Sequence, residues 1–320
     1  MGGLKQFKKT AFWIVLLVAL AGVFSLIDER AEVAQKIEAA NLKLLPFSAA
    51  DVEEFWTKSK EKGVQVRAVR EKDGWWMTSP LRVKGDQEAI EKLLKNVVKT
   101  RKDAVLFENP GVEKEKELGL DDPEREFGVR AKGKETIIQL GDKGPTLNIA
   151  YARFQGENRI FRIHSDVRRE AGSTVYSLRD KTVIGVDPAN FRRLELTRKG
   201  MDNVVIVHDQ GKWSMVEPFE ARASQTKVLE TLFDLKKAEV KEFIEEDPSD
   251  LKPYGLDAPA IKVSVLAHGQ DRPLVLNIGD RDRTKRGYNA NNDGAKKVFL
   301  VEEDLANALK AQASAWKEAD

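Results

Sequence analysis

The chain has 320 residues, of which 41% are hydrophobic and 33% are charged, and its 54 basic residues nearly balance its 52 acidic ones. This length and composition are typical of a folded protein with roughly two domains. Because the basic residues form no stripe along the chain, we expect no nucleic-acid partner. The chain contains no cysteine, which excludes disulfides, thiolate zinc sites and cysteine nucleophiles.

An apolar segment lies close to the N-terminus. Residues 11–27 contain no charged side chain, follow three lysines and precede an acidic pair. At about 1.5 Å per residue, a helix over this segment reaches roughly 25 Å, enough for a bilayer span. The charge asymmetry predicts a single-pass helix in the bacterial inner membrane, with residues 1–10 in the cytoplasm and the bulk of the chain in the periplasm. A cleavable signal peptide is the alternative, because Ala19-Leu20-Ala21 suits cleavage.

The charged, alanine-rich residues 28–43 follow the predicted span. Val33 and Ile37 lie one helical turn apart, so we expect a short helical stalk that lifts the folded part off the lipid. Within the span, Ala21 and Gly22 belong to a face of small residues. Such faces allow close helix packing, and these two residues are therefore predicted to contact a membrane partner.

The chain beyond the stalk repeats itself. Trp75 and Trp213 are 138 residues apart, and so are the prolines that follow them, Pro80 and Pro218. Further matches hold this offset to within two residues over about 120 positions, which chance does not explain. We therefore predict a tandem duplication, with one unit at residues 44–182 and the other at residues 183–320.

In chain order, both units show the same pattern of elements. A strand at residues 64–70 or 204–208 leads through a hairpin turn into a second strand, which carries the tryptophan. Asp86 and Ser224 are good N-cap residues for a helix that follows. Its apolar stripe is expected at Ile90, Leu93, Leu94, Val97 and Val98, and at Val228, Leu229, Leu232, Phe233 and Leu235. Alternating strands complete each unit. The predicted fold is α+β: a mostly antiparallel sheet with one main packed helix, built twice after a transmembrane helix.

A Gly-Leu-Asp-x-Pro motif follows the helix in each unit. Its members are Gly119, Asp121 and Pro123 in "LGLDDP", and Gly255, Asp257 and Pro259 in "YGLDAP". We expect each glycine to be left-handed, each aspartate to accept a backbone N–H in an Asx-turn, and each proline to lead into a strand. The leucine between them, Leu120 or Leu256, is expected to be buried. Turn chemistry therefore explains the motif without a ligand.

The doubled Trp-x(4)-Pro, Gly-Leu-Asp-x-Pro and Ile/Leu-Gly-Asp motifs, after an N-terminal anchor, resemble the bacterial domain-of-unknown-function 4340 family. The resemblance covers the chain after Leu44. It implies a membrane-anchored, extracytoplasmic protein that is often encoded beside ABC transporters of the gliding-motility auxiliary type. It brings no catalytic residue with it.

Little in the sequence points to catalysis. The contiguous His164-Ser165-Asp166 is no triad, because neighbours on a strand point to opposite faces. No phosphate-binding loop, nucleophile elbow or zinc-protease motif is present. We therefore expect a protein that is not an enzyme and needs no cofactor or metal.

A basic hairpin is one candidate for partner or ligand contact. It carries Arg281, Arg283, Lys285 and Arg286. Their charges suit phosphate groups, carboxylates or an acidic protein surface. A solvated loop is the alternative, because two aspartates within it offset half of that charge.

The tryptophans are the other candidates. Trp75 and Trp213 are expected in equivalent core positions, because they match across the duplication. Trp76 should point to the opposite face of its strand, where an exposed indole would be a contact residue.

These observations predict a membrane-anchored binding or scaffold subunit that is auxiliary to an ABC-type transporter. Its expected partners are the membrane subunits of that transporter and, through the N-terminal helix, the lipid bilayer. The alternative is a periplasmic ligand-binding module for envelope glycan or lipid, with the ligand between the two units. An envelope hydrolase is a third alternative, which lacks a nucleophile–base pair.

Overall fold

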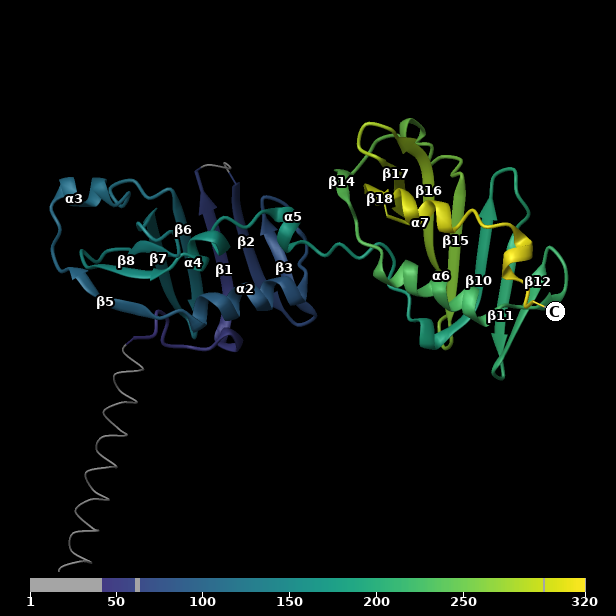
Figure 1. The fold of residues 1–320 in the computed structure, drawn as a ribbon, viewed down its shortest axis with the longest axis horizontal. Helices are drawn as coiled ribbons and strands as arrows, with labels where there is room; N and C mark the ends of the chain where they lie inside the picture. The colour runs from purple at the N-terminus through teal and green to yellow at the C-terminus, as the bar shows by residue number, and fades with distance from the viewer. Residues whose placement is uncertain (1–41, 61–63, 296, 320) are drawn as a thin grey trace, which may run out of the picture. The chain divides into compact units, whose positions relative to one another are not determined.

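The computed structural model describes residues 42–60, 64–295 and 297–319 (Figure 1). The predicted span, most of the predicted stalk, and Ala21 and Gly22 lie outside the described residues. The chain forms two compact units, with the boundary between Asp180 and Lys181. None of the helices within the described residues is long and apolar enough to cross a bilayer.

The first unit is built on one nine-stranded antiparallel sheet with the order β4-β3-β2-β1-β6-β7-β8-β9-β5. Its elements are η1 (Ala49–Asp51), β1 (Val52–Ser59), β2 (Val64–Glu71), β3 (Gly74–Ser79), β4 (Val83–Lys84), α2 (Gln87–Lys99), β5 (Lys102–Phe107), α3 (Val112–Glu117), β6 (Arg125–Ala131), β7 (Lys134–Lys143), β8 (Ile149–Phe154), β9 (Ile160–His164), α4 (Asp166–Glu170) and α5 (Val175–Leu178). Because β4 and β5 are the two edge strands, α2 carries the chain across the face of the sheet.

The second unit repeats this topology with the order β13-β12-β11-β10-β15-β16-β17-β18-β14. Its elements are η2 (Pro188–Asn190), β10 (Phe191–Arg198), β11 (Val204–Asp209), β12 (Lys212–Glu217), β13 (Ala221–Arg222), α6 (Gln225–Lys237), β14 (Glu242–Glu245), η3 (Lys252–Tyr254), β15 (Ile261–Ala267), β16 (Leu274–Asp282), β17 (Gly287–Asn292), β18 (Val298–Glu302), α7 (Glu303–Ala308) and η4 (Ala313–Trp316). The same strand order in both units confirms the tandem α+β duplication.

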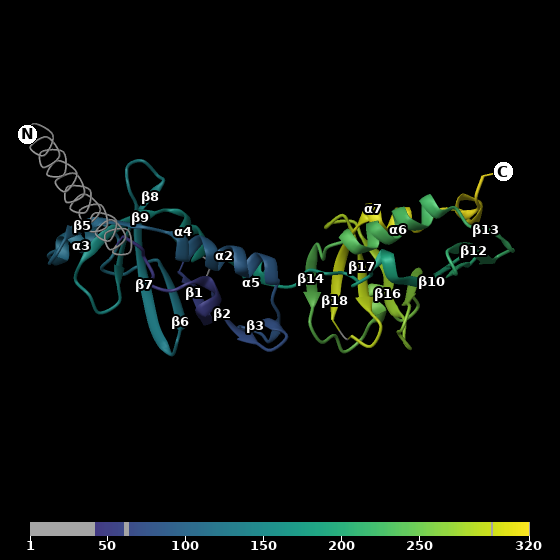
Figure 2. The ribbon, with the colours of Figure 1, turned by 90° about the horizontal axis from the view of Figure 1, so that it is seen from below.

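The main helix of each unit, α2 or α6, lies on one face of its sheet together with shorter helices, α4 and α5 in the first unit and α7 in the second (Figure 2). Asp86 accepts a hydrogen bond from the backbone N–H of Ala89 at 3.0 Å, and Ser224 accepts one from Lys227 at 3.4 Å. Each cap satisfies one of the N–H groups that a helix start leaves without a partner. The apolar core of each unit lies between this helix and the sheet.

The predicted stripe of α6 is wrong at Phe233, which is 45% exposed. The buried positions of α6 are Val228, Thr231, Leu232 and Leu235. Thr231 lies within the buried arc, and its hydroxyl donates to the carbonyl of Lys227 at 3.0 Å, which satisfies the polar group. Phe233 lies about 100° of helix rotation beyond Leu232, which is at the edge of that arc, so its side chain faces away from the sheet.

The Gly-Leu-Asp-x-Pro motif packs against a second repeated motif, Gly-Asp in β7 and β16. Gly119 and Gly255 both have φ of +66°, the left-handed conformation predicted for them. A Cβ at Gly119 would lie 2.9 Å from Cγ of Asp142, and one at Gly255 would lie 2.5 Å from Cγ of Asp280. The following leucines, Leu120 and Leu256, are buried. The glycine of each turn therefore lets the aspartate of the Gly-Asp motif lie close to the backbone, where a Cβ would clash with it.

The expected Asx-turns at Asp121 and Asp257 are not formed. Both side chains are exposed, and within the described part of the chain neither accepts a hydrogen bond. An Asx-turn takes its hydrogen bond from the backbone N–H two residues later. That residue is Pro123 or Pro259, which has no N–H to donate.

Candidate functional site

The basic hairpin between β16 and β17 is partly neutralised within its own unit. Arg281 contacts Glu303 at 2.7 Å, and Lys285 contacts Glu242 at 2.6 Å. The hydrogen bond to Glu303 raises the pKa of Arg281 above its ordinary value, so this guanidinium stays charged. Among the described residues, Arg283 and Arg286 are exposed without an acidic partner. Two of the four predicted contact residues are therefore available to a ligand without breaking an ion pair.

Trp76 lies on the opposite face of β3 from Trp75, as strand alternation predicts. Its indole N–H donates to Asp73 at 3.0 Å, and the guanidinium of Arg82 lies 5.0 Å from its ring centroid. The ring is half-buried. Because its N–H and one of its faces are already occupied, Trp76 offers less to a partner than an open indole would.

Trp75 is enclosed by the first unit and is 1% exposed. Gln87 accepts from the backbone N–H of Trp75 at 2.8 Å and donates to the carbonyl of Gly85 at 2.8 Å. Glu91 accepts from the indole N–H at 3.3 Å and pairs with Arg70 at 3.0 Å. Arg70 in turn covers the ring, 4.6 Å from its centroid. Backbone and side chain of Trp75 are therefore both fixed by polar partners.

Trp213 occupies the equivalent strand position, paired with His208 as Trp75 is paired with Arg70, but its environment differs. It is half-buried at the edge of the core. His208 replaces Arg70 and stacks on the indole at 4.4 Å, while Phe191 stacks at 5.2 Å. Leu229 stands at the position of Glu91. Because leucine accepts no hydrogen bond, the indole N–H of Trp213 is left without a partner among the described residues.

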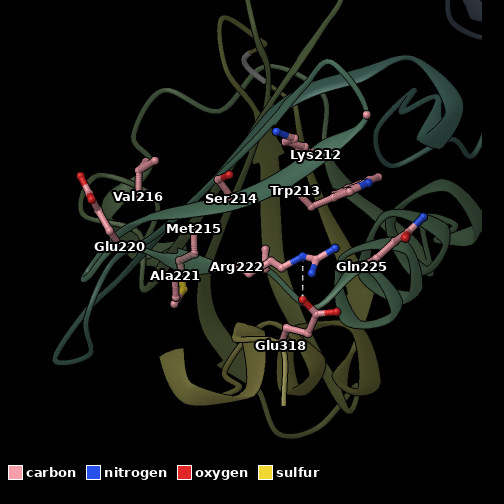
Figure 3. Close-up of a pocket in the computed structure, with 12 residues that line it drawn as sticks. Lys212, Trp213, Ser214, Met215, Val216, Glu220, Ala221, Arg222, Gln225 and Glu318 are labelled. Carbon is pink, nitrogen blue, oxygen red and sulfur yellow. Dashed lines mark ion pairs between the residues drawn. The ribbon is translucent and has the colours of Figure 1, made fainter. Parts of the chain in front are cut away.

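A hollow of about 820 Å³ lies beside Trp213 in the second unit. It is bounded by β12, β13, the first residue of α6 and Glu318 near the C-terminus (Figure 3). Arg222 pairs with Glu318 across it, with Nε and Oε2 2.8 Å apart. Gln225, the counterpart of Gln87, is exposed and extends toward the same side as Trp213 and Arg222. The side chain that secures Trp75 in the first unit is thus free to meet a ligand in the second.

The chemistry of this hollow suits binding. It combines an aromatic face, a fork of guanidinium donors, an amide and a carboxylate, the mixture that orients a polar ligand on an apolar surface. Within the described ranges, no three His, Cys, Asp or Glu side chains are grouped to hold a metal. His164, the last residue of β9, contacts Asp166, the first residue of α4, at 3.1 Å through Nδ1.

The sequence indicates Trp213 but not the hollow. Arg222, Gln225 and Glu318 are not predicted as site residues, and only the unmatched pair Glu91 and Leu229 signals that the second tryptophan lacks its partner. Lining residues from positions 211 to 225 and 318 come together through the fold.

The chain matches the family model described as Domain of unknown function (DUF4340) twice, over residues 75–214 and 213–320. The two matches start at Trp75 and near Trp213, so they repeat with the period of the duplication. Neither the comparison with curated proteins nor that with solved structures finds a match.

Proposed function

This chain belongs to the DUF4340 family of domains of unknown function, and we propose that it is a binding and scaffold subunit without enzymatic activity. Residues 11–27 anchor it in the bacterial inner membrane, and both units work on the periplasmic side. There it holds the membrane subunits of an ABC-type transporter. The charge asymmetry of the N-terminal segment supports the topology, and the resemblance of its motifs to a transporter-associated family supports the partner.

The observation that carries the proposal is the open hollow at Trp213. The same fold occurs twice, and only the second copy leaves the tryptophan half-buried, with its N–H unpaired among the described residues. Tryptophan and arginine are enriched among the few residues that dominate binding energy at protein interfaces. Such a surface needs no reacting group to perform its function.

Co-purification of the full chain from detergent-solubilised membranes tests this proposal. We expect Trp213→Ala to lower recovery of transporter subunits by about tenfold or more, because a central aromatic contact is lost. Phe233→Ala is the matched control, since Phe233 is an exposed aromatic residue of the same unit outside the hollow. Recovery that is unchanged in Trp213→Ala, or no transporter subunit with the wild-type chain, would overturn the proposal.

The two other predicted surfaces are separated by further variants. Arg283→Glu with Arg286→Glu removes the unpaired charges of the hairpin, and Ala21→Leu with Gly22→Leu blocks close packing along the span. Loss of recovery in only one of these pairs would place the main contact there instead of at Trp213.

A ligand-binding module for envelope glycan is a second candidate function. Trp213 beside Arg222, Glu318 and Gln225 favours it, because a flat aromatic face with hydrogen-bonding groups around it suits a sugar ring. Calorimetric titration of the full chain with soluble peptidoglycan fragments tests it. Binding that is lost in Trp213→Ala and kept in Phe233→Ala would support this function, and absence of heat would exclude it.

A further inference from the structure

The first unit has a hollow of its own, of about 780 Å³, at the opposite end of the sheet from Trp75. It lies between the segment that leads into the unit, the β6–β7 hairpin and the end of β8. Four lysines line it: Lys43, Lys102, Lys132 and Lys134. Apolar side chains, Phe47 and Phe154 among them, form the rest of the wall.

The two acidic residues of the lining each contact an arginine that lies outside the hollow. Glu135 pairs with Arg130 at 3.7 Å, and Glu157 pairs with Arg159 at 2.8 Å. Neither arginine belongs to the lining. Arg130 lies closer to Glu54, at 2.9 Å, so it compensates Glu135 only in part. By formal charge the lining still holds four lysines against two acids, so it carries a net positive charge.

Only one of the four lysines has an acidic partner among the described residues. Lys132 pairs with Asp51 at 3.2 Å. Within the same part of the chain, Lys43, Lys102 and Lys134 form no ion pair. Three ammonium groups that share one hollow repel each other, and an anion bound among them would remove that cost.

Lys102 is held in place although it has no anionic partner among the described residues. It begins β5 and is half-buried, and its Nζ lies 5.8 Å from the ring centroid of Phe154 and 5.9 Å from that of Phe161. Aromatic faces attract a cation, so they restrict this side chain to the hollow. A preorganised ammonium loses little freedom when a ligand binds.

The second unit lacks these features at the corresponding positions. Val240, which is 1% exposed, stands where the first unit has Lys102. Asn292 stands where it has Phe154, and the Asn292 amide donates to the carbonyl of Val183 at 2.8 Å, which closes the gap. The basic hollow is therefore not required by the shared fold.

We propose that this hollow binds a phosphate group that is attached to an apolar moiety. The three unpaired ammonium groups would contact the phosphate oxygens, and the wall around Phe47 and Phe154 would cover the apolar part. A phospholipid is the source we expect, since the hollow includes Lys43 at the end of the predicted stalk, and free phosphate, which has no apolar part, is the alternative that the test distinguishes. This site is independent of the partner surface at Trp213.

Calorimetry on the full chain in a non-ionic detergent tests the proposal with three probes: inorganic phosphate, dihexanoyl phosphatidylglycerol and dihexanoyl phosphatidylcholine. Lys102→Gln with Lys134→Gln is expected to weaken phosphatidylglycerol binding by about a hundredfold, since each of the two lost charge-assisted contacts contributes about a tenfold factor. Lys84→Gln with Lys95→Gln removes the same charge from the same unit outside the hollow and should bind as the wild type does.

The probes distinguish the sources. Phosphatidylglycerol bound at least about tenfold more tightly than phosphate identifies a lipid, because the apolar wall then contributes. Equal affinities would contradict the apolar part of the proposal and leave free phosphate as the ligand. Phosphatidylcholine, whose headgroup has no net charge, is expected to bind more weakly than phosphatidylglycerol, and equally tight binding would contradict the role of the ammonium groups. If none of the probes binds, or if the hollow variant binds like the control, the proposal is wrong. Should Lys102→Gln disturb folding by circular dichroism, the exposed pair Lys43→Gln and Lys134→Gln replaces it.

Discussion

The two units have the same strand order and the same main helix, but each has a hollow at a position that the other fills with side chains. The first unit encloses Trp75 with polar partners and keeps a basic hollow at Lys102. The second fills the position of Lys102 with Val240 and opens a hollow at Trp213. Apolar residues maintain the fold in both copies, so a few polar positions were free to diverge. The two hollows that we propose as binding sites therefore lie where the copies differ.

The largest expected effect separates the two tryptophans. Trp75→Ala should destabilise the first unit by about 3–5 kcal/mol, because it empties a fully buried site and leaves Glu91 without its indole donor. Trp213→Ala should cost the second unit roughly half as much, because that side chain is half-buried. Urea unfolding followed by hydrogen exchange of each unit measures both costs. Equal losses of unfolding free energy would show that the two tryptophans stabilise their units equally in spite of their different burial.

A second prediction concerns what the units share. Gly119→Ala and Gly255→Ala should each cost about 2–3 kcal/mol, because both combine a left-handed backbone with an aspartate where the new Cβ would lie. Gly133→Ala is the control: it has φ of +72° but nothing within 4 Å of its Cβ, so about 1 kcal/mol is expected. The same unfolding assay applies. A large difference between Gly119→Ala and Gly255→Ala would mean that the motifs are not packed alike.

A third prediction transfers the enclosure of Trp75 to the second unit. Leu229→Glu with His208→Arg should supply the acceptor and the covering guanidinium, and so stabilise the unit by about 1 kcal/mol through one net hydrogen bond. Exchange of the Trp213 indole proton, measured by nuclear magnetic resonance, should slow. Leu229→Gln alone is a milder control. An unchanged exchange rate would show that more than these two residues keeps Trp213 open.

The smallest expected effect is on acid stability. Ser48 donates to the carboxylate of Asp51 from its backbone and its hydroxyl, and together with Lys132 it lowers the pKa of Asp51 from 3.8 to about 2. A lowered folded-state pKa means that this contribution is complete above pH 3.8 and is lost as pH falls toward 2. Asp51→Asn should therefore make the free energy of unfolding of the first unit less dependent on pH between 3.8 and about 2. Asn190 occupies the matching position of the second unit and has no carboxylate to titrate. A steeper loss of stability on acidification in the second unit than in the first would contradict this account.

Local sequence patterns are enough to predict the architecture of each unit. The 138-residue period, the N-caps Asp86 and Ser224 and the left-handed glycines Gly119 and Gly255 all follow from such patterns, because turns, caps and alternation depend on neighbours in the chain. Strand alternation also places Trp76 opposite Trp75. These features recur in both copies, which is why the amino-acid sequence suffices to predict the duplication.

Contacts that form only in the folded unit decide which side chains remain exposed. Whether Trp213 is covered depends on Leu229, which follows it by 16 residues, and the hollow beside it is completed by Glu318 from the end of the chain. Phe233 is exposed because the arc of α6 that faces the sheet runs through Thr231 and Leu232 and leaves Phe233 outside it. Local patterns report which side chains prefer burial. Which side chain covers which is settled by packing between residues far apart in the chain, and no local pattern encodes that packing.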